Sequence, residues 1–199
     1  MNCVILLFDG FDELDAIGPY EVFANAANAG ADCTPSLRTI DDTDRVTASH
    51  GLRVEPDGQL DAVEPDLLVI PGGGWNDRGE TGTWAEAERG VIPEAIAEAA
   101  ERGTTIAGVC TGGMLLARAG VLDGRPAVTH KDALADLRAT AADVVDARVV
   151  DDGDVLTAGG VTAGLDLAVH LVDRAFGAEI TEAVQTEIEY TPQGSVHVS

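Results

Sequence analysis

The chain of 199 residues is long enough for one well-filled hydrophobic core, and no Pro-, Gly- or Ser-rich stretch divides it, so we expect a single domain over residues 1–199. Asp and Glu number 35 against 12 Lys and Arg, which gives a formal net charge of −23 and leaves Lys131 as the single lysine. Nucleic acid and anionic lipid are recognised by clustered Lys and Arg, so this composition argues against both as partners.

The acidic residues are expected to coat a folded surface. Hydrophobic residues make up 45% of the sequence and form regular runs, which disordered segments do not. A surface of mutually repelling carboxylates destabilises a compact fold at low salt and keeps it hydrated at high salt. The charge therefore predicts a protein from a halophile.

Strand and helix are predicted to alternate along the chain. Short β-branched apolar runs bounded by turn residues indicate buried parallel strands over residues 4–8, 67–70, 104–109, 148–150 and 155–158. Helices are expected over residues 19–30, 84–102 with a break near Gly90 and Pro93, 111–119, 132–137, 162–176 and 179–187. Residues 45–47 and 51–54 indicate a small hairpin.

This alternation is typical of an α/β fold. We expect a flavodoxin-like three-layer sandwich, in which a mostly parallel sheet carries helices on both faces. Ligands bind outside the carboxyl ends of the strands in such sheets, so the residues just after each strand carry the information about function. Three of these turns contain residues suited to chemistry.

The first turn is Gly108-Val109-Cys110-Thr111-Gly112, between a predicted strand and a predicted helix. It has the form of a nucleophile elbow with cysteine as the nucleophile, and its glycines relieve the crowding of a sharp turn. A helix N-terminus favours a thiolate, so the pKa of Cys110 is expected to be lowered. Cysteine can also be a small buried hydrophobic residue, which suits Cys3 and Cys33 in strand-like runs. Position and flanking glycines favour Cys110 as a reactive nucleophile.

The second turn, Pro71-Gly72-Gly73-Gly74, directly follows the predicted strand at residues 67–70. It lacks the Gly-Lys-Ser/Thr ending of a phosphate-binding loop, and a glycine run can be simply flexible. Glycines also let a backbone N–H approach a substrate closely. The N–H groups of Gly73 and Thr111 are therefore predicted to form an oxyanion hole beside the thiolate, with Gly72 as an accessory residue.

The third turn follows the first strand and contains Asp15. Four of the seven residues from Asp9 to Asp15 are acidic, and such a run is ordinarily a solvated surface. Asp15 differs because its neighbours Leu14, Ala16 and Ile17 are apolar, so we expect it to be half buried. A desolvated carboxyl has a raised pKa and can donate to a thiolate or carry a proton during turnover.

His130 is a further candidate, since it ends a strand-like run at residues 127–129 and Asp132 could orient it; capping or packing is the alternative role. The three cysteines form no CxxC pair and have no histidine at metal-ligand spacing, so neither a disulfide framework nor a metal site is predicted. The N-terminus shows no basic leader and no apolar run of membrane-spanning length. We therefore expect a cytoplasmic protein.

Together these motifs resemble the ThiJ/PfpI superfamily over nearly the whole chain, through the elbow at residues 107–112, the turn at residues 70–74 and Asp15. Residues 15–23, 110–112 and 157–166 are most similar to the isonitrile hydratase branch, and the same pattern occurs in the sensing domains of AraC-type regulators. The resemblance implies a homodimer that acts on a small molecule without a cofactor. It also implies that Cys110, Thr111 and Asp15 form the functional set.

Differences from the family pattern limit which of the family's activities we expect for this chain. Thr111 stands where the intracellular protease branch has histidine, which argues against peptidase activity. His130 falls where a histidine stands near the cysteine in the deglycase relatives, which leaves glyoxalase or deglycase chemistry open. A regulator would need a helix-turn-helix domain after the last helix, and the chain up to Ser199 leaves no room for one.

The leading hypothesis is a hydro-lyase that adds water to an isonitrile and gives an N-substituted formamide, with Cys110 as nucleophile and Asp15 as proton donor. One alternative is glyoxalase or deglycase activity on methylglyoxal through a hemithioacetal at Cys110. The other is a non-catalytic redox or ligand sensor in which Cys110 oxidises to a sulfinate beside Asp15.

Overall fold

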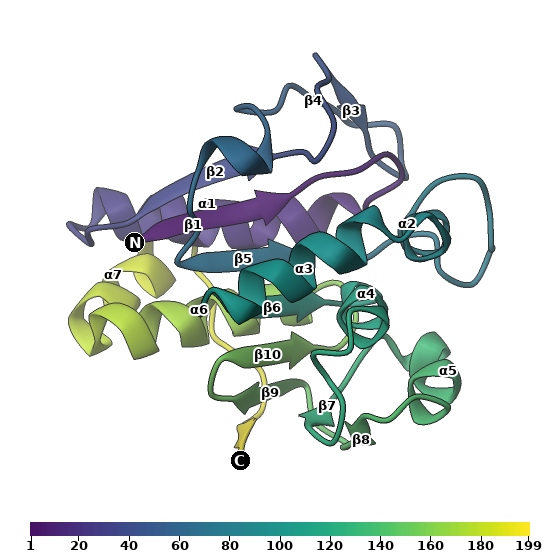
Figure 1. Ribbon diagram of the computed structural model, residues 1–199. Helices are drawn as coiled ribbons and strands as arrows, with labels where there is room; N and C mark the ends of the chain where they lie inside the picture. Colours follow the sequence, from purple (N-terminus) through teal and green to yellow (C-terminus); the bar gives the residue numbers. More distant parts are fainter.

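The computed structural model describes residues 1–199 and is built on a seven-stranded sheet with the strand order β11-β9-β10-β6-β5-β1-β2 (Figure 1). Its strands are β1 (Asn2–Leu6), β2 (Thr34–Arg38), β5 (Leu67–Ile70), β6 (Thr105–Val109), β9 (Val149–Asp152), β10 (Val155–Ala158) and β11 (Val196–Val198). Strands β2, β1, β5, β6 and β10 are parallel, whereas β9 runs antiparallel to β10. The sheet is therefore mostly parallel, as predicted.

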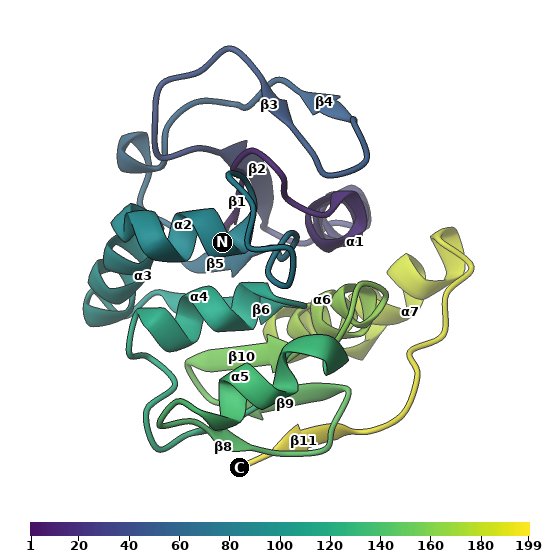
Figure 2. The same cartoon turned by 90° about the vertical axis from the view of Figure 1, so that its right-hand side faces the viewer.

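Helices cover both faces of this sheet. They are α1 (Glu13–Asn28), α2 (Thr83–Arg89), α3 (Val91–Glu101), α4 (Gly112–Arg118), α5 (Leu134–Arg138), α6 (Ala163–Phe176) and α7 (Ala178–Glu187). The two views place α1, α6 and α7 on one face and α2, α3 and α4 on the other (Figures 1 and 2). This arrangement confirms the flavodoxin-like three-layer sandwich. None of the helices has the length and apolar character needed to cross a bilayer.

Helix α1 begins at Glu13, not near Pro19 as the sequence predicts. The side chain of Asp12 caps the helix by accepting a hydrogen bond from the N–H of Leu14 at 3.2 Å, and Pro19 lies inside the helix. The capping aspartate thus outweighs the proline as a signal for the helix start. As a result, Asp15 lies in the first turn of α1 and not in a loop.

The pairing of β9 with β10 corrects a second expectation, because both were predicted as parallel strands. Only Gly153 and Asp154 connect them, and Gly153 has a φ of 79°. Two residues make a hairpin turn, whereas a parallel pair needs a crossover of about a dozen residues or more. The connection alone therefore forces the antiparallel pairing.

Within the seven-stranded sheet, the sequence pattern misses strands β2 and β11. β2 contains Pro35 and only one strongly apolar residue, Leu37. It lies at the edge of the sheet and pairs only with β1, so the missing N–H of Pro35 is tolerated there. β11 lies at the opposite edge.

Among the smaller elements, the hairpin and the break between α2 and α3 follow the sequence prediction. β3 (Val46–Thr47) and β4 (Arg53–Val54) pair antiparallel, which confirms the predicted hairpin. Helices α2 and α3 are separated at Gly90, which has a φ of 83° and ends α2 as a left-handed cap. The remaining elements are the parallel pair β7 (Pro126–Ala127) and β8 (Asp143–Val144) and the 3₁₀ turns η1 (Leu60–Ala62) and η2 (Lys131–Ala133).

Candidate active site

Cys110 lies at the carboxyl end of the central strand β6, in a left-handed backbone conformation with a φ of 55°. Its N–H donates to the carbonyl oxygens of Ala158 and Gly159 at 3.1 and 2.9 Å, and its own carbonyl accepts the Thr129 hydroxyl at 2.7 Å. A non-glycine residue in this region is strained and persists only where its surroundings fix it. These three hydrogen bonds hold Cys110 in the elbow.

Two glycines allow the neighbouring turns to meet at the elbow. A Cβ at Gly112 would collide with the carbonyl oxygen of Ile70, at the end of β5. A Cβ at Gly72 would lie 2.5 Å from the Thr111 nitrogen and 2.8 Å from Asp15 Oδ2. The absence of side chains at these two positions brings Thr111 and Asp15 together.

Asp15 is completely buried, deeper than the sequence predicts. Its Oδ2 accepts the Gly72 N–H at 2.9 Å, and its Oδ1 has no hydrogen-bond partner. Burial, together with the negative charge of Asp12, raises the pKa of Asp15 to about 8, although the hydrogen bonds from Gly72 and Cys110 act to lower it. At neutral pH this carboxyl is therefore mostly protonated.

The Cys110 thiol does not have the lowered pKa that its helix N-terminal position predicts. Burial, followed by the negative charge of Asp15, raises the pKa of Cys110 to about 12. The backbone N–H groups of Val161 and Thr111 hydrogen-bond the sulfur and act in the opposite direction, but they are outweighed. The sulfur therefore keeps its proton at neutral pH, and Asp15 is the carboxyl beside it.

The two N–H groups at the sulfur differ from the predicted pair. The Gly73 N–H donates to Thr111 Oγ1 at 2.9 Å, so it is not a free oxyanion donor. Its place beside Thr111 is taken by Val161, which follows β10 and has a φ of 34°. Val161 is not predicted from the sequence, although the glycine pair at residues 159–160, directly after a buried strand, is a signal of the same kind as Gly72 and Gly73.

His130 lies beside the turn that carries Val161 and makes no hydrogen bond to Cys110. Its Nδ1 accepts the Asp132 N–H at 3.3 Å and lies 3.7 Å from the Asp132 carboxylate. Its ring packs so closely on Gly160 that a Cβ there would lie 2.6 Å from Cδ2. The ring therefore caps η2 and supports the Val161 turn.

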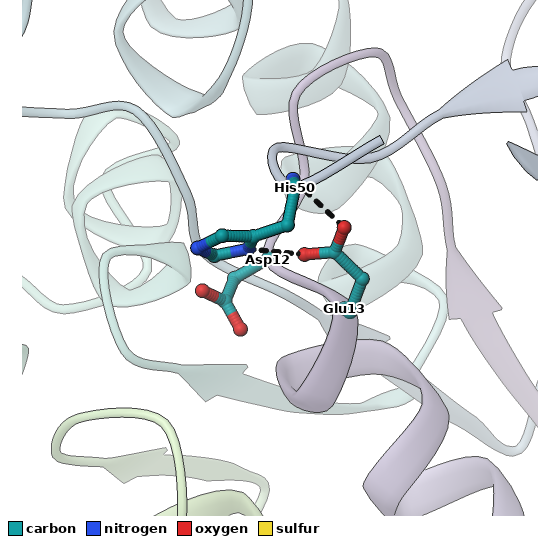
Figure 3. A group of neighbouring side chains, drawn as sticks. All are labelled: Asp12, Glu13 and His50. Carbon is teal, nitrogen blue, oxygen red and sulfur yellow. Dashed lines mark hydrogen bonds and ion pairs between the residues drawn. The ribbon is translucent and has the colours of Figure 1, made fainter. Parts of the chain in front are cut away.

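Three ligand-type side chains gather beside the site, at the start of α1 (Figure 3). The backbone N–H and Nδ1 of His50 lie 2.8 and 2.7 Å from the Glu13 carboxylate, which also accepts bonds from Ser49 and Leu52. Burial acts to raise the pKa of Glu13, but the bonds from His50 and the backbone outweigh it and lower this pKa to about 2. Asp12, Glu13 and His50 are the residues that could hold a metal ion, yet Glu13 is already engaged in fastening the β3–β4 hairpin to α1.

The chain is similar to proteins of one known family. Residues 1–174 match the model of the DJ-1/PfpI family. An isonitrile hydratase of Pseudomonas putida is 34% identical over 189 residues, which cover 94% of this chain and 77% of the relative. A deglycase of Thermococcus kodakarensis is 29% identical over 165 residues, covering 77% of this chain and 87% of the relative. The crystal structure of a ThiJ/PfpI family protein from Pseudomonas syringae superposes with a TM-score of 0.82 at 29% identity, covering 97% of this chain and 76% of the other.

Proposed function

The chain belongs to the DJ-1/PfpI family, and from this membership we propose that it is a cysteine-dependent enzyme that adds water to an isonitrile and releases an N-substituted formamide. The observation that carries the proposal is the buried pair of Cys110 and Asp15, in which the thiol keeps its proton at neutral pH and the ionised form of the adjacent carboxyl, which grows as pH rises through about 8, can accept it. Such a pair can form a nucleophile and deliver a proton within one site.

In the first proposed step, the Asp15 carboxylate takes the proton of Cys110 as the sulfur attacks the terminal carbon of the isonitrile. The same carboxyl then returns that proton to this carbon. The product is a thioimidate, in which the carbon is bonded to sulfur, to hydrogen and, through a double bond, to nitrogen. No proton has left the site, so the step suits a buried pair.

In the second step, water adds to the thioimidate carbon while Asp15 carries the proton. One proton of the water ends on nitrogen and the other returns to sulfur as the C–S bond breaks. The formamide leaves and Cys110 is free again. Only protons and the sulfur take part, so the proposed reaction needs no cofactor.

Thr111 and Val161 are proposed to stabilise charge during these steps. Their N–H groups hydrogen-bond the sulfur and would hold its negative charge as the thiol proton leaves. Gly73 is proposed to hold the Thr111 hydroxyl, to which its N–H donates, and Gly72 to hold the Asp15 carboxyl in the same way. We further propose a cytoplasmic homodimer with a small-molecule substrate, as the family resemblance implies.

The test is product analysis with a small isonitrile and with methylglyoxal, each offered separately in molar salt to the wild type and to Cys110→Ala. Formamide from the wild type that vanishes in Cys110→Ala is the expected result. Cys33→Ala is the matched control, because Cys33 is also buried but lies just before β2, and it should keep full turnover. Full turnover by Cys110→Ala would overturn the proposal.

Deglycase or glyoxalase chemistry is the second candidate, favoured by the deglycase relative and by the place of His130 next to the Val161 turn. It predicts lactate from methylglyoxal that depends on both Cys110 and His130. If neither substrate is converted, mild peroxide followed by intact mass tests the sensor hypothesis, which requires Cys110 alone to gain two oxygens.

A further inference from the structure

Thr83 is a completely buried residue whose hydroxyl contacts two groups of the candidate site. Its Oγ1 lies 2.8 Å from the carbonyl oxygen of Gly73 and 3.1 Å from Thr111 Oγ1. Its backbone N–H donates to the same Gly73 carbonyl at 2.7 Å. Gly73 in turn donates its N–H to Thr111 Oγ1 at 2.9 Å, so the three residues form a closed hydrogen-bonded ring.

The hydroxyl of Thr83 is not used by its own helix. Thr83 is the first residue of α2, but the residue in the capping position is Gly82, and no side chain caps this helix. Threonine near a helix start ordinarily satisfies the free N–H groups of the first turn. Here the hydroxyl points instead to Gly73 and Thr111, which lie 10 and 28 residues away in the sequence.

The ring leaves Thr111 two possible directions for its own hydroxyl proton. Thr83 has a single hydroxyl proton and two acceptors for it. When the Thr83 hydroxyl donates to the Gly73 carbonyl, the Thr111 hydroxyl completes the ring by donating to Thr83 Oγ1. When the Thr83 hydroxyl donates to Thr111 Oγ1 instead, the Gly73 carbonyl still accepts the backbone N–H of Thr83. The hydroxyl proton of Thr111 is then free to point at a substrate.

We propose that Thr83 is a positioning residue that fixes the place and the hydrogen-bond direction of the Thr111 hydroxyl. Rotation of one buried hydroxyl changes Thr111 between an acceptor and a donor toward the reacting group, without moving any chain segment. The inference rests on the proposed function to the extent that Thr111 faces the isonitrile, but the ring itself does not depend on the identity of the substrate.

The test compares Thr83→Val, which keeps the shape and removes the hydroxyl, with Thr83→Ser, which keeps the hydroxyl. With an isonitrile as substrate, Thr83→Val is expected to lower kcat by about tenfold, the typical effect of one lost hydrogen bond in an active site, with a smaller change in KM. Thr83→Ser should stay close to the wild type. Thr104→Val is the matched control. Thr104 is a buried threonine just before β6 whose hydroxyl donates to the Pro65 carbonyl, and loss of this hydroxyl should leave kcat unchanged.

A double-mutant cycle with Thr111→Val shows whether Thr83 acts through Thr111. In the Thr111→Val background, Thr83→Val is expected to lower kcat no further. Losses that multiply, or an equal loss in Thr83→Ser, would overturn the proposal.

Hydrogen exchange of the Gly73 amide gives a readout that needs no turnover. Thr83→Val should speed this exchange by about tenfold, because Thr111 Oγ1 loses one of the groups that hold it, whereas Thr83→Ser should not. If the wild type does not hydrate isonitriles but the exchange follows this pattern, the proposed function fails and the role of Thr83 stands. Unchanged exchange in Thr83→Val would overturn the role of Thr83 itself.

Discussion

The thiol of Cys110 lowers the pKa of the Asp15 carboxyl, whereas Asp15 raises the pKa of the Cys110 thiol. The thiol stabilises the carboxylate by a hydrogen bond, whereas the carboxylate raises the pKa of the thiol. Between pH about 8 and about 12 the pair therefore holds one proton, mainly on the sulfur. This is the proton that the proposed reaction moves.

The first prediction concerns the pH dependence of turnover. Because Asp15 must be a carboxylate to accept the thiol proton, kcat/KM should rise with pH through about 8 and level off above it. The measurement is a pH profile of formamide release. A profile that falls as pH rises through about 8 would instead make the protonated Asp15 the reactive form.

The second prediction separates thiol reactivity from turnover. Replacing Asp15 by Asn removes the negative charge that raises the pKa of Cys110, so alkylation by iodoacetamide at pH 9 should become faster, roughly tenfold for each unit by which this pKa falls. Formamide production should be lost at the same time. The alkylation of Cys3 and Cys33 is measured in Cys110→Ala and subtracted. Slower alkylation in Asp15→Asn would contradict the assigned contact.

The third prediction is a change of stability with pH. The pKa of Asp15 in the folded chain, about 8, lies above its unfolded value, so the folded state binds more protons between these values. The contribution of Asp15 to the free energy of unfolding is thus complete below pH about 4 and is lost as pH rises through about 8. Asn does not titrate, so the Asp15→Asn variant should not lose this stability as pH rises.

Urea unfolding of the wild type and of Asp15→Asn at pH 5 and pH 9 measures this effect. From pH 5 to pH 9, the free energy of unfolding of the variant should rise relative to that of the wild type by a few kcal/mol. The expected change is about 1.4 kcal/mol for each unit of pKa difference that is titrated. The other carboxylates titrate in both proteins and cancel in the comparison. A constant difference between the two proteins would show that Asp15 is ionised in the folded chain.

The fourth prediction tests the packing of His130 on the Val161 turn. Gly160→Ala places a methyl group against the His130 ring and should lower stability by about 1–3 kcal/mol, as overpacking does, and slow turnover by moving the Val161 N–H. His130→Ala removes the opposing ring, so the double variant should recover most of both losses. Thermal melts and kcat of all four proteins complete the cycle. A direct chemical role of His130 would instead leave the double variant inactive.

The fifth prediction follows from the net charge of −23 and tests the proposed halophilic source. Salt shortens the distance over which charges repel, from about 10 Å at 0.1 M to about 3 Å at 1 M. The melting temperature should therefore rise steeply over this range. Sucrose at matched osmolality is the control for effects unrelated to charge, and an equal rise in sucrose would remove the electrostatic explanation.

Much of the fold and part of the site could be predicted because both follow from local patterns. Buried parallel strands have continuous apolar runs, which place β1, β5 and β6 in the sequence. The turns after these three neighbouring strands meet at one edge of the sheet, which is why Cys110, Thr111, Asp15, Gly72 and Gly73 lie together.

The rest of the site has no local signal. Val161 contributes a backbone N–H, which every residue except proline has, so only the tertiary structure shows that it reaches the sulfur. Thr83 is an ordinary threonine in the sequence, and its partners become neighbours only through folding. The pKa of Cys110 is raised because burial and the charge of Asp15 outweigh the opposing effect of two backbone N–H groups. Sequence position alone does not reveal this balance.

The positive φ of Cys110 also has a consequence for substitutions at this position. A left-handed conformation costs a residue with a Cβ about 1 kcal/mol or more, while glycine adopts it freely. Glycine at position 110 would relieve this backbone strain but would also remove the buried Cys110 side chain from the core. The left-handed backbone at position 110 is thus a cost in folding free energy that Cys110 bears, and this cost is consistent with the chemical role proposed for its sulfur.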